Sequence, residues 1–252
     1  MTDYWEIFPR FFDTHQAFIF ADIGISEVID THLSQTLATI NVTFKYPSPT
    51  GMPHPDEYDT IRMIEEQIEA FSENNNDHYV GRITNDGQRD LYIYTNNPQQ
   101  HWQDFVAKLP EASSYTITAK VTDDSQHATY WDKLYPTSED FRAIADLHLI
   151  RLTQEENDDN SQPRNIDHFI YFNKQLEAQP FIDWATRNNF THLHSESHIT
   201  DENQYCVRLA HRGTLELSDI IPHTITLSNQ AEIHGGIYDG WETELVNTPS
   251  IT

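Results

Sequence analysis

The chain has 252 residues, of which 37% are hydrophobic and 12% aromatic, enough apolar material for one or two globular domains with their own cores. It carries 40 acidic and 15 basic residues, a formal net charge of −25 at pH 7. Such a field repels nucleic-acid phosphates and anionic lipid, so we expect no direct binding of RNA or membrane and regard a cationic partner as the natural complement. The competing interpretation is that the charge only keeps the protein soluble.

A single cysteine, Cys206, excludes an internal disulfide and any multi-cysteine zinc motif, which is typical of a reducing compartment. Asp3 and Glu6 stand where a signal peptide would carry Lys or Arg. No uncharged apolar run approaches the roughly twenty residues that a membrane span requires. We therefore expect a cytoplasmic protein.

Strand and helix periodicities alternate through the first half of the chain. Ile40, Val42 and Phe44 recur at every second position, as in a strand with one buried face, whereas Asn85-Asp86-Gly87 is a hairpin signal. The expected elements are strands over 16–23 and 37–46, a helix over 56–72, strands over 78–84 and 89–95, a helix around 102–109 and a strand over 115–122. After the first strand this order is β-α-β-β-α-β, the ferredoxin-like arrangement.

The run Tyr130-Trp131 to Pro136 is expected to close the first domain, with its aromatic side chains at the edge of the core. The second half then repeats the same order. The expected elements are a helix capped by Ser138, a strand over 165–172, a short helix around Pro180, strands over 190–197 and 204–211, a helix capped by Ser218 with Pro222 in its first turn, and a last strand through Val246. The predicted fold class is thus α+β, with two ferredoxin-like antiparallel-sheet domains in tandem, 1–136 and 137–252.

Three glycines mark the turn before the last strand. Gly235 and Gly236 follow a helical pattern and predict a left-handed C-cap, because glycine takes positive φ without a Cβ penalty. Gly240 is expected to let the backbone pass closely beneath Trp241.

The segment Gly236-x-Tyr238-Asp239-Gly240-Trp241-Glu242 resembles the signature of the bacterial regulator of ribonuclease activity B family. A second block, Pro163 to Phe172, resembles the same family and contains His168 beside Phe169. Members of this family are small acidic proteins that bind and restrain endoribonuclease E. The resemblance implies a non-enzymatic regulator that needs no cofactor and binds a basic, arginine-rich segment of such an enzyme. The residues that it marks for partner binding are Tyr238, Asp239, Trp241, Glu242 and His168.

Two of these positions invite specific chemistry. Asp239 and Glu242 flank Trp241 and predict an aromatic and acidic notch for an arginine, unless Asp239 only caps the turn. His168 either titrates near neutral pH or is a hydrogen-bonded structural residue.

The first half resembles an uncharacterised bacterial domain family. The resemblance rests on Gly81-Arg82-Ile83-Thr84, on Gly87-x-Arg89-x-Leu91-Tyr92-x-Tyr94 and on the ending Trp131 to Pro136. It implies a fold and no activity.

The alternative function is metal binding or enzymatic catalysis. His192, His194 and Glu196 alternate along one predicted strand and so share a face, with His198 just beyond, which are credible ligands for zinc or nickel. Spacing supplies no complete ligand set, so we expect no bound metal. Cys206 lies in an alternating strand pattern without a partner base and is expected to be a small sheet residue.

Overall fold

The computed structural model describes residues 2–11 and 16–246, and it divides the chain into two compact units, Met1–Asp140 and Phe141–Thr252. Both units are built from helices packed on an antiparallel sheet, so the predicted α+β class is confirmed. None of the helices among the described residues has the length and apolar character needed to cross a membrane.

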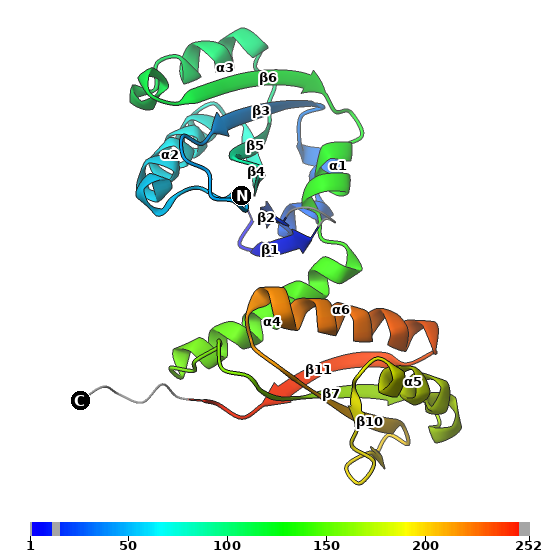
Figure 1. Ribbon diagram of the computed structural model, residues 1–252. Coiled ribbons are helices and arrows are strands. Elements are labelled where there is room, and N and C mark those ends of the chain that lie inside the picture. Colours follow the sequence, from blue (N-terminus) through cyan, green and yellow to red (C-terminus); the bar gives the residue numbers. More distant parts are fainter. Residues whose placement is uncertain (1, 12–15, 247–252) are drawn as a thin grey trace, which may run out of the picture. The chain divides into compact units, whose positions relative to one another are not determined.

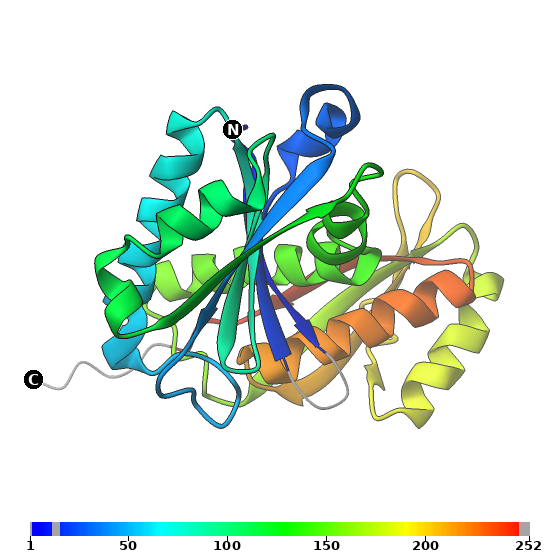
Figure 2. The ribbon, with the colours of Figure 1, turned by 90° about the horizontal axis from the view of Figure 1, so that it is seen from above.

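The first unit contains a six-stranded antiparallel sheet in the order β1-β2-β4-β5-β3-β6. Its strands are β1 (Trp5–Phe11), β2 (Gln16–Asp22), β3 (Thr36–Thr43), β4 (His78–Asn85), β5 (Gln88–Tyr94) and β6 (Thr116–Asp123). Its α-helices are α1 (Ile29–His32), α2 (Tyr58–Asn74) and α3 (Gln99–Val106). Figure 1 shows α2 and α3 on one side of this sheet and α1 on the other, and Figure 2 shows how strongly its strands twist.

The apolar patterns of this unit build the core that they predict. Ile61, Ile64 and Ile68 of α2 pack against Ile40 and Val42 of β3, and all five are essentially without solvent exposure. Burying aliphatic side chains of this size stabilises the fold by roughly 1.5–3 kcal/mol each. The helix therefore lies on the sheet because its apolar stripe and the apolar inner face of β3 bury each other from water.

Strand β1 was not predicted from the sequence. Pro9 interrupts its pattern, and proline is excluded from central strands because it has no N–H for the ladder. The structure places β1 at the edge of the sheet, paired only with β2, where a proline is tolerated.

The segment after β6 closes this unit. Tyr130 is fully buried in a single π-type turn, Tyr130–Leu134, and its hydroxyl donates to the carbonyl of Asp22 at 2.8 Å. Arg10 of β1 pairs with Asp140 through Nη2 and Oδ2 at 2.6 Å. The expected core-sealing role is confirmed for Tyr130, whereas Trp131 is 38% exposed.

The second unit contains a sheet in the order β11-β7-β10-β8, with β9 pairing a further part of β10. Its strands are β7 (Arg164–Phe172), β8 (Thr191–His192), β9 (His198–Ile199), β10 (Tyr205–Gly213) and β11 (Ile237–Thr243). Its helices are α4 (Ser138–Glu155), α5 (Gln175–Arg187) and α6 (Leu217–Ile233), of which α4 begins three residues before the unit boundary. All three helices bury their apolar residues against the same face of the sheet.

Two helix starts differ from the prediction. Ser138 is the first residue of α4, and Thr137 is the cap: its hydroxyl accepts from the Asp140 N–H at 3.2 Å, and Asp140 Oδ2 accepts from the Thr137 N–H at 2.9 Å. Helix α6 begins at Leu217, so Ser218 is inside it and Pro222 lies beyond its first turn. The proline is accommodated although the helix loses one backbone hydrogen bond there.

The glycine turn is partly as predicted. Gly235 has φ of 76°, and the Gly235 and Gly236 N–H groups donate to the carbonyls of Glu232 and Ala231 at 3.0 and 2.7 Å, a Schellman cap. Gly236 does not take positive φ; it is required because a Cβ there would lie 2.5 Å from the ring of Phe172. The expected close approach at Gly240 is wrong, since a Cβ there would meet open space.

Candidate protein-interaction surface

The sheet of the second unit has one face without helices of its own. Along β7, Ile166, His168 and Ile170 point to the helices, so the alternate residues Asp167 and Phe169 point to the other side. The strand register places Arg208 of β10 beside Phe169 and Glu242 of β11 beside Asp167, so these side chains lie on the same side as their partners in β7. We call this second side the open face; its principal residues are Asp167, Phe169, Tyr171, Arg208, Arg212, Asp239 and Glu242.

One arginine on the open face is shared among three carboxylates. Arg208 Nη2 lies 2.9 Å from Asp167 Oδ2 and 2.6 Å from Glu242 Oε1, and Nη1 lies 2.9 Å from Glu196 Oε2. Its guanidinium also lies 4.7 Å from the centre of the Phe169 ring. Burial raises the pKa of Asp167, and repulsion from Glu196 and Glu242 adds to it despite the attraction of Arg208. The cluster keeps a surplus of two negative charges, and Asp239 is exposed nearby on β11.

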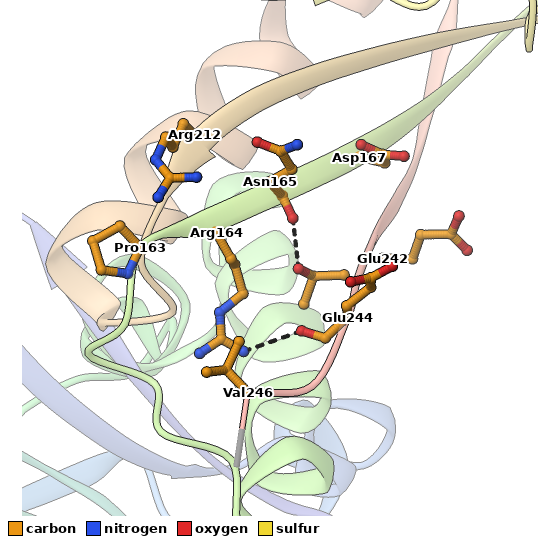
Figure 3. A pocket seen from close by; sticks show the side chains of 9 residues that line it. Pro163, Arg164, Asn165, Asp167, Arg212, Glu242, Glu244 and Val246 are labelled. Atoms are coloured by element: carbon orange, nitrogen blue, oxygen red, sulfur yellow. Dashed lines mark hydrogen bonds between the residues drawn. The ribbon is translucent and has the colours of Figure 1, made fainter. Parts of the chain in front are cut away.

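A pocket lies where the open face meets the end of β11 (Figure 3), with a volume of about 590 Å³. Its polar lining includes Asp167, Arg212, Glu242 and Glu244. Arg164 closes one side: its Nη1 donates to Asp158 Oδ2 at 2.6 Å and to the Glu244 carbonyl at 3.3 Å. Arg164 is thereby committed to holding the chain after β11, so the cations that remain beside the pocket's carboxylates are Arg212 in its lining and Arg208, which Asp167 and Glu242 share with Glu196.

The predicted aromatic notch is wrong. Trp241 is 7% exposed and packs in the core, and its Nε1–H donates to Asp146 Oδ1 at 2.9 Å. A register shift between Tyr238 and Gly240 turns both aromatic rings inward and leaves Asp239 and Glu242 outside. Arginines of the chain itself lie over aromatic rings in this unit: Arg208 over Phe169 on the open face and Arg142 over Tyr238 on the buried side.

The sequence left two roles open for His168, titration near neutral pH or a structural hydrogen bond, and the structure shows the structural role. Its Nδ1 lies 2.8 Å from the Tyr238 hydroxyl and its Nε2 lies 2.7 Å from Nδ1 of His211, which stacks on His223 at 4.3 Å between ring centres. Burial, with the neighbouring imidazoles, lowers the pKa of His168 well below its usual value and that of His211 to about 4. The lowered pKa values keep both imidazoles neutral near pH 7, where one of the two rings donates its single N–H to the other.

Asp146 anchors the other side of this buried layer. It accepts from the Trp241 indole, from the Thr224 hydroxyl and from Arg142 Nη2, the last at 3.3 Å. Burial nevertheless raises the pKa of Asp146. The residues Tyr238, Trp241 and His168 therefore fix β7 and β11 against the helices and present Asp239 and Glu242 on the far side.

The predicted histidine strand is also wrong. Strand β8 contains only Thr191–His192; beyond it the N–H groups of Glu196 and Ser197 both donate to the Leu193 carbonyl and form a turn. Glu196 pairs with Arg208, and the rings of His192 and His194 are edge to face at 5.6 Å. Within the described residues, no three His, Cys, Asp or Glu side chains are grouped to hold a metal ion.

Sequence reasoning missed Asp167, Phe169 and Arg208. Each stands in an alternating strand pattern that could have placed it opposite the apolar residues. The alternating pattern does not predict which strands pair. The structure pairs β7 with both β10 and β11 and so brings these residues together in one sheet.

The fold and this surface define a two-unit, acidic α+β protein whose second unit presents a carboxylate-rich sheet face. The chain belongs to the family of unknown function DUF695, whose family model matches residues 3–135. The model of the family described as regulator of ribonuclease activity B matches residues 143–243. Both resemblances noted in the sequence are confirmed. A search of curated proteins finds no match. The second match associates the second unit with the regulation of ribonuclease activity.

Proposed function

We propose that this protein is a cytoplasmic, non-enzymatic regulator that binds the basic segment of an endoribonuclease of the ribonuclease E type and so affects RNA turnover. The second unit, within the residues that match the regulator family, would make the contact. Protein contact rather than RNA contact follows from the charge, because a surface at −25 repels phosphate.

The observation that carries the proposal is the surplus of carboxylates on the open face. Asp167, Glu196 and Glu242 share one arginine, and Asp239 is exposed beside them. Arginine side chains of a partner can form paired hydrogen bonds with such carboxylates. Among the residues that the resemblance marked, Asp239 and Glu242 are proposed to touch the partner, and Tyr238, Trp241 and His168 to position them.

We also infer that each unit is a version of the ferredoxin-like fold. In the second unit, β7, α5, β8, β10, α6 and β11 follow in the order β-α-β-β-α-β, and the sheet order is β11-β7-β10-β8. In the first unit, β3, β4, β5 and β6 have the equivalent order β6-β3-β5-β4, with β2 and β1 added beyond β4. We propose domain limits of 1–136 and 137–252, which a folded, separately expressed second domain would support.

The test is titration of the purified protein against an arginine-rich peptide from the endoribonuclease at 0.1 M and 1 M salt. The Debye length falls from about 10 Å to about 3 Å over this range, so affinity should fall steeply. The double substitution Asp239→Asn with Glu242→Gln should weaken binding at least tenfold. A matched control, Glu177→Gln with Glu232→Gln, removes the same charge from α5 and α6 and should change little.

A labelled RNA is the second arm of this experiment. Binding to RNA alone, or peptide binding that ignores both salt and the open-face substitutions, would contradict the proposal.

A further inference from the structure

Strands β1 and β2 extend the first sheet beyond β4, and among the described residues part of their α2-side face lines a pocket. The register pairs Ile7 with Phe20 and Phe20 with Arg82, so these three side chains form one row. Phe18, Thr84 and Arg89 form the next row through the same pairing rule. Both arginines reach Glu65 of α2, so these rows lie on the α2 side of the sheet.

These rows form the floor of a pocket of about 250 Å³, and residues at and before the start of α2 form its wall. Met52, Pro53 and the half-exposed Tyr58 line that wall. The preceding loop is fixed in place: Gly51 has φ of 77°, and its carbonyl accepts from the Gly87 N–H of the β4-β5 turn at 2.9 Å. The wall of the pocket is therefore held in place by the protein's own backbone hydrogen bonds.

The lining of the pocket is basic in an acidic protein. Arg82 and Arg89 share the single carboxylate of Glu65, with Arg89 Nη1 at 2.8 Å from Oε2. The lining contains these two arginines and no carboxylate, in a chain with 40 acidic and 15 basic residues. Glu69 of α2 also interacts with Arg82, but burial and repulsion from Glu65 raise its pKa to about 7, so near neutral pH it offsets the second guanidinium only in part.

The arginines are also held in fixed orientations. Arg89 Nε donates to the Thr84 hydroxyl at 3.0 Å, and the Arg82 guanidinium lies 4.5 Å from the centre of the Phe20 ring. Tyr79 donates to the same Glu65 oxygen that Arg82 contacts, at 3.0 Å. Arginines restrained in this way lose little side-chain freedom when they bind an anion.

We propose that this pocket binds a small organic anion with an apolar body. A carboxylate or phosphate head would lie between Arg82 and Arg89, and a ring or branched chain would lie against Phe18, Phe20 and Ile7. A cavity of about 150 Å³ holds benzene, so this volume fits one ring with a short acidic chain. The site is in the first unit and is independent of the surface proposed for the endoribonuclease.

The experiment is calorimetric titration of the full-length protein with 3-phenylpropionate, phenyl phosphate and the neutral 3-phenylpropan-1-ol. Saturable one-to-one binding of at least one anion is expected, and the comparison of the two identifies the preferred head group. The neutral alcohol should bind at least tenfold more weakly, because it forms no charge-assisted hydrogen bonds with the arginines.

Two variants separate binding from folding. Arg89→Gln should lower the anion affinity at least tenfold, and Phe18→Ala should lower it while both ion pairs to Glu65 remain. Arg62→Gln, on the exposed side of α2, is the matched control and should bind normally. The proposal is overturned if neither anion saturates the protein at millimolar concentration, or if folded Arg89→Gln and Phe18→Ala bind as well as the unmodified chain.

Discussion

The two units contain ion clusters of opposite composition. In the first unit one carboxylate, Glu65, holds two arginines, whereas in the second one arginine, Arg208, is shared by three carboxylates. Each cluster lies on a sheet face beside an aromatic ring, Phe20 or Phe169. The net charge of −25 is consistent with the carboxylate-rich cluster of the second unit, but it gives no indication of the arginine-rich cluster of the first. The chemistry that a surface can bind is therefore set by the local balance of charges.

The largest expected effect tests whether Glu65 holds the first cluster together. Glu65→Ala leaves Arg82 and Arg89 largely buried without their carboxylate, and we expect a loss of about 2–4 kcal/mol in the unfolding free energy of the first unit. Urea unfolding monitored by tryptophan fluorescence measures it. Glu66→Ala, one residue along on the exposed side of α2, is the control and should cost less than about 0.5 kcal/mol.

A second prediction is that the stability of the second unit depends on pH through its buried histidines. Burial lowers the pKa of His211 from 6.5 to about 4, so the unfolded chain binds more protons between these values, and stability is present above pH 6.5 and lost as pH falls toward 4. His211 alone should contribute roughly 2–3 kcal/mol of this loss to the second unit.

Segment-resolved amide exchange at pH 7, 5.5 and 4.5 checks the prediction, with protection lost first in β7, β10 and β11. His211→Phe should reduce the pH dependence over this range. A second unit whose protection stays constant down to pH 4 would show that the histidine layer is not linked to folding.

A third prediction concerns the open-face cluster. Arg208→Gln removes the charge that one partly buried carboxylate, Asp167, and two largely solvated ones, Glu196 and Glu242, share, so stability should change by no more than about 1 kcal/mol. Binding of an arginine-rich peptide should tighten and depend more steeply on salt, because the face gains negative charge. Peptide affinity and thermal unfolding of the same sample measure both effects, and weaker peptide binding would argue that Arg208 itself contacts the partner.

The smallest effect is expected from metal removal. Glu196 is engaged by Arg208, and no third ligand joins the neighbouring rings of His192 and His194 among the described residues, so a chelator should leave the melting temperature unchanged. Metal analysis of the purified protein, with His194→Ala as the comparison, checks this. A zinc ion bound one to one and lost in that variant would revive the metal-binding alternative.

Patterns within single elements determined much of this protein. The alternation in β3, the strand β7, the helical stripe of α2, the Asp86-Gly87 hairpin and the cap at Gly235 follow from local geometry, and each is found where it was expected. Both family resemblances also came from local motifs. Local patterns failed where neighbours in space decide the outcome: at the edge strand β1, at the start of α6 and at the turn after β8.

Only the tertiary structure decided what the motif residues do. A one-residue irregularity in β11 places Tyr238 and Trp241 inside and Asp239 and Glu242 outside, and no spacing rule in the sequence predicts that irregularity. The cluster around Arg208 and the pocket of Arg82 and Arg89 each need strands far apart in the chain to pair in a particular register. Side-chain identity set the available charges, and strand pairing selected which of them meet, because a shift of one residue would turn each side chain to the other face.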